Sequence, residues 1–159
     1  MKKRIASLFI VSLLGFAACT KPMIYGKDRP VEPVTQSFSA SGQDTYNAAK
    51  EVLKTMGYKI SYDNLEKRTL KTGWRSTAVD SHYVELFGRP DYGTVGAYYQ
   101  LIVEVGDKEG KSEVTITAQP RSIVPNIKSS GRVEKKVLGH MADLLRSDDI
   151  QVTNVGLQE

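Results

Sequence analysis

The spacing of apolar residues predicts a helix between Ser41 and Gly57. Apolar positions recur every three or four residues there, which places them on one side of a helix. They are Tyr46, Ala49, Val52, Leu53 and Met56. Ser41 can cap the start of this helix together with Asp44, three residues further on. Gly57 can end it in the left-handed conformation, so we expect a helix over Gly42–Met56.

Directly after Gly57 the pattern changes to an alternation of apolar and polar residues, which is typical of strands. One face of the first predicted strand carries Tyr58, Ile60 and Tyr62. One face of the second carries Leu70, Thr72 and Trp74. We expect a hairpin over Tyr58–Val79, with 84–87 extending or ending this strand region. Trp74 is the only tryptophan and lies on the apolar side of its strand, which predicts a core anchor.

A glycine-rich loop is expected over Gly88–Gly96, longer than most hairpin connections. Arg89 and Tyr92 lie in it, and both are residue types that are enriched at binding hot spots. Neither fits the periodic core pattern. We therefore predict that Arg89 and Tyr92 contact a partner. The competing interpretation is a solvated connection in which Tyr92 only covers the edge of a hairpin.

The clearest alternation lies in the second half of the chain and predicts another antiparallel hairpin over 98–118. Its buried face should carry Tyr99, Leu101, Val103 and Val105 on one strand and Val114, Ile116 and Ala118 on the other. Pro120 is expected to end the second strand. A second amphipathic helix is expected over Arg132–Arg146, with Ser130 as its cap. On this helix we expect Glu134 to face water and Gly139 to approach the sheet closely.

These elements predict an α+β fold with the order β-α-β-β-β-β-α. Both helices are amphipathic, so they should lie on one face of a single antiparallel sheet. We expect one such domain over residues 34–159. Residues 19–33 hold three prolines and a glycine and should form a solvated tether.

The N-terminus has the features of a secretory signal. Lys2, Lys3 and Arg4 precede an apolar run that ends in small residues at Ala18. We expect residues 1–18 to be a lipoprotein signal peptide, because Phe16-Ala17-Ala18-Cys19 resembles a lipobox. Cys19 is the only cysteine, and we predict that it carries covalent lipid. The alternative is an ordinary signal peptide with an incidental cysteine.

Removal of the signal changes the charge of the chain. The full sequence holds 22 basic and 18 acidic residues, a formal net charge of +4. Without Lys2, Lys3 and Arg4 the balance is 19 against 18, or +1. A nucleic-acid partner is therefore not expected.

Candidate chemistry is sparse in the sequence. His82 and His140 are the only histidines. Asp80, Ser81 and His82 have the residue types of a catalytic triad, but neighbours on a strand point to opposite faces and cannot assemble one. His140 is expected to be solvated. No pattern of metal ligands is present, so we expect no metal, no cofactor besides the lipid on Cys19, and no enzymatic activity.

The stretch from Ala48 to Trp74 resembles the repeated domain of the BamC (NlpB) outer-membrane assembly lipoproteins. The shared features are the helix with Val52-Leu53, then Gly57-Tyr58-x-Ile60, then Leu70-x-Thr72-Gly73-Trp74. This resemblance implies a helix-grip layout. The lipopolysaccharide-assembly lipoproteins have a similar size and layout, but their motif just after the cysteine is absent, where Thr20-Lys21-Pro22 stand instead.

From these features we expect a non-enzymatic lipoprotein of the bacterial cell envelope, anchored in the outer membrane and facing the periplasm. It would serve as an accessory or scaffold subunit of an outer-membrane assembly or envelope complex, with an envelope protein as partner. The alternative is a module that binds a small apolar ligand or a lipid in the groove between helices and sheet. A hydrolase acting on envelope polymers is a third possibility, which the missing catalytic constellation disfavours.

Overall fold

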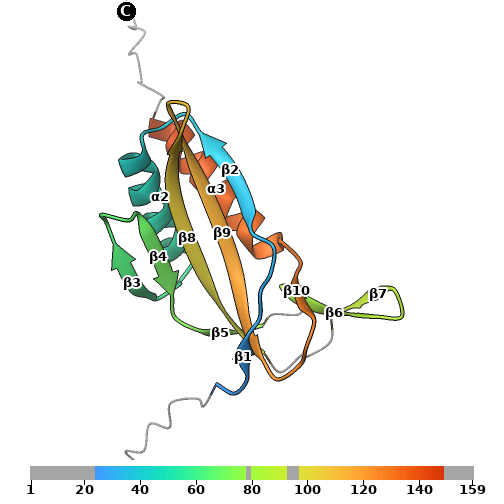
Figure 1. Cartoon of the computed structure of the whole chain (residues 1–159). Helices are drawn as coiled ribbons and strands as arrows, with labels where there is room; N and C mark the ends of the chain where they lie inside the picture. The colour runs from blue at the N-terminus through green and yellow to red at the C-terminus, as the bar shows by residue number, and fades with distance from the viewer. Residues whose placement is uncertain (1–23, 78–79, 93–96, 149–159) are drawn as a thin grey trace, which may run out of the picture.

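Two helices pack on a curled antiparallel sheet, and a small second sheet lies at one end of the molecule (Figure 1). The computed structural model describes residues 24–77, 80–92 and 97–148. The helices are α2 (Gly42–Thr55) and α3 (Arg132–Asp148). The strands are β1 (Lys27–Asp28), β2 (Val34–Phe38), β3 (Ile60–Asn64), β4 (Thr69–Thr72), β5 (Arg75–Ser76), β6 (His82–Leu86), β7 (Arg89–Asp91), β8 (Tyr98–Lys108), β9 (Lys111–Ser122) and β10 (Ile127–Ser129).

The main sheet is built around the long hairpin of β8 and β9. These strands pair from Tyr98↔Arg121 at one end to Lys108↔Lys111 at the other. The strand order is β1-β9-β8-β4-β3, with β2 also on the outer edge of β9 and β5 on β8. In Figure 1 the two helices lie side by side behind this sheet. The predicted arrangement of both helices on one sheet face is therefore confirmed.

The core lies between the helices and the sheet and follows the predicted pattern. All seven residues expected on the inner face of β8 and β9 are buried. They meet the inward side of α2 and three buried residues of α3, which are Val137, Leu138 and Met141. Alternation on the strands and 3.6-residue spacing on the helices thus converge on one apolar layer.

Helix α2 begins and ends where the sequence predicts. The Ser41 hydroxyl oxygen accepts a hydrogen bond from the Asp44 backbone N–H at 3.1 Å. The same hydroxyl donates to the Asp44 carboxylate at 2.6 Å, which completes the cap. Gly57 ends the helix with a φ of +73°, a conformation that a side chain would strain.

Helix α3 starts at Arg132 as predicted, but three expectations for its residues are wrong. The Ser130 hydroxyl accepts from the Arg132 backbone N–H at 3.3 Å, although the Gly131 carbonyl accepts the first helical bond, so Ser130 lies one residue before the N-cap position. Gly139, however, faces open space, because nothing lies within 4 Å of the position that a Cβ would take. Glu134 is fully buried instead of facing water. The reason for its burial lies in the candidate site described below.

Strand β9 continues through Pro120 to Ser122, so the predicted end at Pro120 is wrong. Proline lacks the N–H that a sheet partner needs. Here Pro120 lies beside the gap between β1 and β2. Its carbonyl oxygen accepts a hydrogen bond from the Arg29 backbone N–H at 2.9 Å. Strand β1 lies within residues 19–33, so the segment expected to be a tether without regular structure contributes an edge strand.

Two aromatic side chains leave the core positions predicted for them. The register between β3 and β4 shifts between Ile60 and Tyr62, and this irregularity interrupts the alternation. Tyr62 is consequently exposed. Trp74 falls between β4 and β5, is only half-buried and lies outside the core cluster. Its ring is covered by the Arg121 guanidinium at 4.3 Å from the ring centre.

The second sheet corrects the prediction of a single sheet. It has three strands in the order β10-β6-β7, all antiparallel. The sequence predicts a loop over Gly88–Gly96, but Arg89–Asp91 forms β7, which pairs with β6. Figure 1 shows the β6–β7 hairpin projecting from the same end of the molecule as β1.

Candidate functional site

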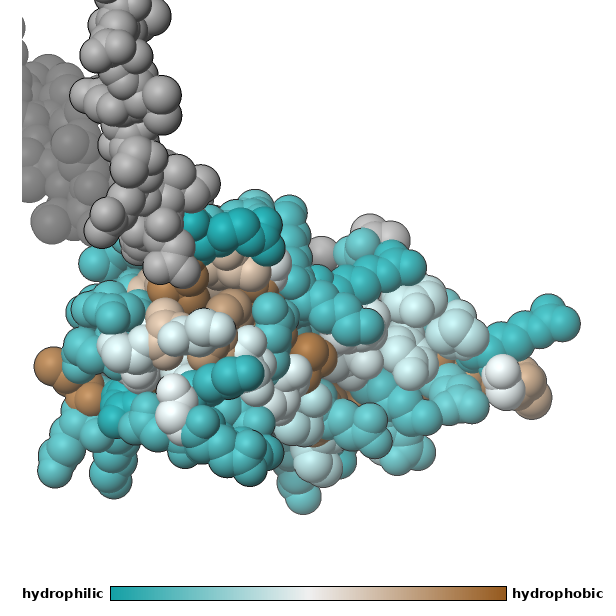
Figure 2. All heavy atoms as spheres, turned by 90° about the horizontal axis from the view of Figure 1, so that it is seen from above, coloured by the Kyte–Doolittle hydropathy of each residue, from teal (hydrophilic) through white to brown (hydrophobic). Residues whose placement is uncertain are grey.

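The projecting β6–β7 hairpin carries the most exposed apolar side chain of the described residues. Its turn consists of Phe87 and Gly88, both in the left-handed region with φ values of +50° and +73°. Two such residues in succession form the tight turn that suits a twisted hairpin. Phe87 is fully exposed and Leu86 beside it is 48% exposed. In Figure 2 hydrophobic surface appears at the far right end of the molecule, where this projection ends.

The structure separates the two residues predicted to contact a partner. Arg89 is exposed next to the turn, whereas Tyr92 is half-buried behind β7. The Tyr92 ring lies 5.4 Å from the ring of Tyr83 and 5.7 Å from the Arg132 guanidinium. Tyr92 thus has contacts inside the domain and is partly exposed, whereas Arg89 is exposed.

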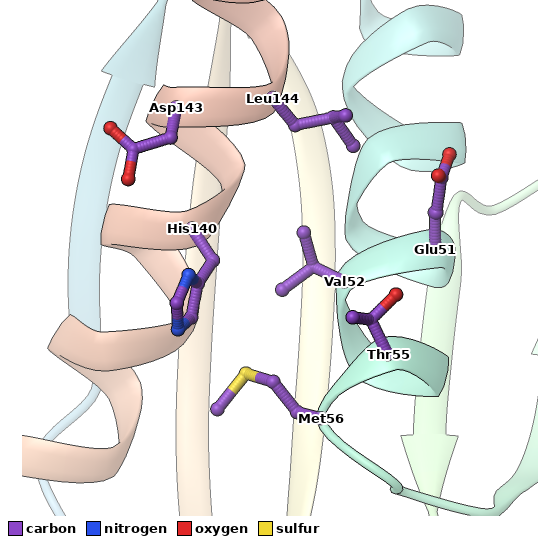
Figure 3. Close-up of a pocket in the computed structure, with 7 residues that line it drawn as sticks. All are labelled: Glu51, Val52, Thr55, Met56, His140, Asp143 and Leu144. Carbon is purple, nitrogen blue, oxygen red and sulfur yellow. The ribbon is translucent and has the colours of Figure 1, made fainter.

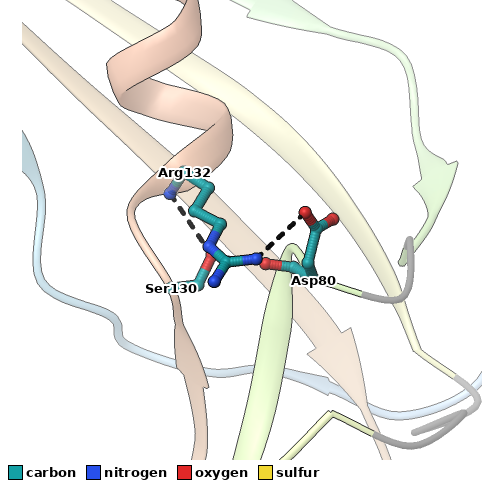
Figure 4. A network of polar contacts seen from close by, with 3 residues as sticks. All are labelled: Asp80, Ser130 and Arg132. Carbon is teal, nitrogen blue, oxygen red and sulfur yellow. Dashed lines mark hydrogen bonds and ion pairs between the residues drawn. The ribbon is translucent and has the colours of Figure 1, made fainter.

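A polar network fastens the second sheet to the start of α3 (Figure 4). The Arg132 guanidinium pairs with the Asp80 carboxylate at 3.2 Å. The Ser130 hydroxyl donates to the Asp80 carbonyl oxygen at 2.6 Å. The same hydroxyl accepts from the Arg132 backbone N–H, as described above. Lys128 and Glu85 form a further ion pair at 2.5 Å between β10 and β6. The hairpin therefore projects from a base that is held by several independent contacts.

Under this sheet lies a buried group of polar side chains, Ser81, His82 and Glu134, each at most 1% exposed. Glu134 Oε1 accepts from the Ala118 backbone N–H at 3.3 Å and from the Ser129 hydroxyl at 2.6 Å. His82 Nε2 lies 2.8 Å from the Ala118 carbonyl oxygen. Glu134 Oε2 has no hydrogen-bond partner among the described residues.

The gap between β1 and β2 explains why these side chains are buried. Ala118 is opposite Leu101, but the Leu101 N–H donates to Thr72 Oγ1 on the other side. The two residues therefore direct their backbone groups away from each other. Ala118 faces the gap, where no strand pairs with it. Because buried backbone groups need partners, Glu134 and His82 replace the missing strand.

This geometry assigns His82 a structural state. A carbonyl oxygen only accepts hydrogen bonds, so Nε2 carries the proton, and Nδ1 accepts from the Ser81 hydroxyl at 3.1 Å. Burial lowers the pKa of His82, while its bond to Ala118 and the charge of Glu134 oppose that shift. Ser81 and His82 do contact each other, which strand alternation did not predict. Both are enclosed, so the group lacks the access to solvent that a substrate needs.

An open groove runs between the outer sides of α2 and α3, with a volume of about 510 Å³ (Figure 3). Val52, Met56 and Leu144 form its apolar part, and Figure 3 shows them pointing into the space between the helices. The polar residues lining it are Glu51, Thr55, His140 and Asp143. The groove is thus amphipathic and open. Core side chains pack between the helices and the sheet, and a further open groove of about 410 Å³ is lined by Phe38 of β2, Asp44 of α2 and Leu145 of α3.

Several predictions concern residues outside the described ranges. Cys19 and the signal sequence 1–18 are among them. Within the described residues, no helix is long and apolar enough to cross a bilayer. In the same part of the chain, no three histidine, cysteine, aspartate or glutamate residues are grouped so that they would hold a metal ion.

Comparison with models of protein families and with curated proteins finds no match to this chain.

Proposed function

We propose that this chain is a non-enzymatic lipoprotein of the bacterial cell envelope, anchored through Cys19 in the outer membrane and facing the periplasm. In this proposal the domain is an accessory or scaffold subunit that binds an envelope protein. The resemblance of Ala48–Trp74 to the BamC outer-membrane assembly lipoproteins supports the same assignment and the helix-grip layout. The lipid on Cys19 would be its only prosthetic group.

The observation that carries the proposal is the apolar cluster packed between the helices and the sheet. Seventeen buried residues form one cluster there. A domain that carries an apolar ligand inside needs an unfilled volume. A domain that acts through its surface does not. The enclosure of Ser81, His82 and Glu134 further supports a role without catalysis, because these groups already complete the backbone hydrogen bonding of β9.

The groove between α2 and α3 is the surface that we assign to the protein partner. Its apolar part is formed by Val52, Met56 and Leu144, and polar residues of both helices line the rest. This combination suits an amphipathic segment of another protein. The predicted partner contact at Arg89 and Tyr92 is the competing location. Arg89 is the more exposed of these two residues, so a probe at Arg89 can detect a partner that binds there instead.

Anchoring is tested by metabolic labelling with a fatty acid. We expect label on the protein, and loss of both label and membrane association in Cys19→Ser. Several acyl chains give durable anchoring, where one alone binds only marginally. Label that persists in Cys19→Ser would refute the lipoprotein assignment.

Partner binding is tested with a photoreactive amino acid placed at single positions in intact cells. We choose Thr55 in the groove, Arg89 on the hairpin, and Lys67 in the exposed β3–β4 turn as the control. The proposal expects an adduct with an identified envelope protein at Thr55 and none at Lys67. An adduct at Arg89 alone would move the partner to the hairpin.

A small apolar ligand or a lipid is the second candidate function, and the apolar part of the groove favours it. Organic extraction of the purified mature chain, followed by mass spectrometry, tests this candidate. A stoichiometric lipid that is lost in Leu144→Gln, without a protein adduct at Thr55, would replace the scaffold function. Leu145→Gln is the matched control, because Leu145 does not line this groove.

A further inference from the structure

Six large apolar side chains are exposed among the described residues, and four of them lie at one end of the molecule. The six are Tyr25, Tyr62, Leu65, Leu86, Phe87 and Ile123. Strand β1 pairs with the last residues of β9, Lys27 with Ser122 and Asp28 with Arg121. Tyr25 and Ile123 therefore flank the same end of the sheet, where they are 67% and 72% exposed.

The hairpin tip belongs to this end as well. One groove of about 540 Å³ is lined by residues of three segments, the chain after β1, the hairpin and the β9–β10 connection. Its lining includes Pro30, Gly88 and Asn126. Figure 1 shows β1 and the hairpin at the lower end of the molecule, away from the β8–β9 turn. The remaining exposed residues, Tyr62 and Leu65, lie on β3 and in the β3–β4 turn.

The tip conformation makes the exposure of Phe87 notable. A tight turn with two positive φ values favours asparagine or aspartate followed by glycine. A bulky residue with positive φ is uncommon and strained. At this position Phe87 is fully exposed, so no packing within the described domain offsets that strain. An environment outside the domain that accepts an aromatic ring would offset it.

The length of the chain before the structure indicates which environment that is. This step rests on the lipid anchor proposed above. Five residues lie between Cys19 and Tyr25, so the chain takes six steps from one to the other, each covering at most about 3.6 Å when fully extended. An anchor on Cys19 therefore keeps Tyr25 within roughly 22 Å of the bilayer surface. The anchor therefore keeps the end of the domain with the exposed apolar residues near the bilayer.

The charges at this end agree with a lipid surface. Lys27 and Arg89 are exposed beside the apolar residues, and long cationic side chains can reach lipid phosphates while their stems stay in the apolar layer. Two acidic residues there are neutralised by ion pairs, Asp28 by Arg121 and Glu85 by Lys128. Glu32 and Asp91 are exposed acidic residues in the neighbouring segments and favour an orientation that keeps them in water.

We propose that this end of the domain lies on the bilayer that holds the anchor. Leu86, Phe87, Tyr25 and Ile123 enter the boundary between lipid head groups and acyl chains, as aromatic and aliphatic residues of peripheral proteins do. The contact fixes the orientation of the domain, so that the β8–β9 turn points away from the membrane.

The test reconstitutes the anchor chemically. Because Cys19 is the only cysteine, the purified mature chain can be coupled through it to a maleimide lipid in vesicles of phosphatidylethanolamine and phosphatidylglycerol. A single tryptophan is placed at the tip by Phe87→Trp in a Trp74→Phe background. The matched control has Leu65→Trp in the same background. We expect that lipids brominated on their acyl chains quench emission from position 87 and leave position 65 unchanged.

Equal quenching at both positions, or none at 87, would overturn the proposal, and so would a protein adduct from a photoreactive residue at 87 in cells. If Trp74→Phe impairs folding, hydrogen exchange on the lipid-coupled chain without substitutions tests the same membrane contact. Slower exchange over 85–89 in the presence of vesicles is expected, and unchanged exchange contradicts the contact. Failure of the lipoprotein assignment appears separately, as fatty-acid labelling that survives Cys19→Ser.

Discussion

Glu134 and His82 bind the two backbone groups of the same residue, Ala118. Glu134 Oε1 accepts from its N–H at 3.3 Å, and His82 Nε2 donates to its carbonyl oxygen at 2.8 Å. One side chain comes from α3 and the other from β6. Through Ala118 they join the second sheet, the main sheet and a helix at one point.

Truncation of Glu134 should destabilise the domain. Glu134→Ala leaves the buried Ala118 N–H without its acceptor, which costs about 1–3 kcal/mol of unfolding free energy. Glu134→Gln keeps an acceptor oxygen at Oε1 and should lose less. Urea unfolding followed by circular dichroism measures both variants. Equal losses in the two variants would show that charge or packing, and not this hydrogen bond, is what matters.

Acidification should destabilise the domain through His82. Its pKa in the folded state lies below the ordinary value of about 6.5 because burial disfavours the charged ring. Below pH 6.5 the unfolded chain binds a proton that folded His82 does not yet bind. Stability therefore falls as the pH drops from 6.5 toward the folded pKa. Urea midpoints between pH 7.5 and 5 measure this slope.

The second histidine provides the matched control for that experiment. His140 is exposed on α3, so His140→Ala should keep the slope, whereas His82→Ala should remove it. The carboxylates with lowered pKa values, Asp63, Glu85 and Asp107, lose their contribution only in more acidic solution. A slope that is unchanged in His82→Ala would contradict the assignment.

Arg89 and Tyr92 should differ in their effects on stability. Tyr92→Ala removes the contacts with Tyr83 and Arg132 and should cost about 1–2 kcal/mol. Arg89→Ala changes an exposed side chain, so its effect should stay within about 0.5 kcal/mol. Thermal unfolding separates the two. Co-purification with envelope proteins from the same cells then shows whether Arg89 contacts a partner. If Arg89→Ala loses a co-purified protein, unfolding would not explain that loss.

The pattern of residues predicted the parts of the fold that depend on local periodicity. Strands β8 and β9 alternate without interruption, and their buried faces are those expected. The cap at Ser41 and the end at Gly57 follow from local backbone chemistry in the same way. In each case the deciding residues lie within a few positions of one another.

The errors arose where distant segments decide the outcome. Glu134 was expected to face water because no signal in α3 indicates that Ala118 needs an acceptor. The gap that creates this need depends on where β1 and β2 leave β9. Likewise the sequence places Phe87 at the end of a strand region and Gly88 at the start of a long loop, because a tight turn with Phe87 at positive φ is uncommon. The short alternation in His82–Leu86 was the available sign of a second sheet.

Trp74 should fasten the N-terminal strand rather than the core. Its ring packs under the Arg121 guanidinium, whose Nε donates to Asp28 Oδ1 at 2.6 Å and whose Nη2 donates to Asp28 Oδ2 at 3.1 Å. Asp28 belongs to β1, so the Arg121 guanidinium links the Trp74 ring to the N-terminal strand.

Trp74→Ala should therefore cost about 1–2 kcal/mol, less than the 3–5 kcal/mol of a fully buried tryptophan. Trypsin should also cut faster after Lys27, because β1 detaches more often. Trp74→Phe keeps an aromatic face for Arg121 and should preserve most of the protection. A loss of several kcal/mol in Trp74→Ala, with unchanged cleavage in β1, would restore the tryptophan to the role of a core anchor.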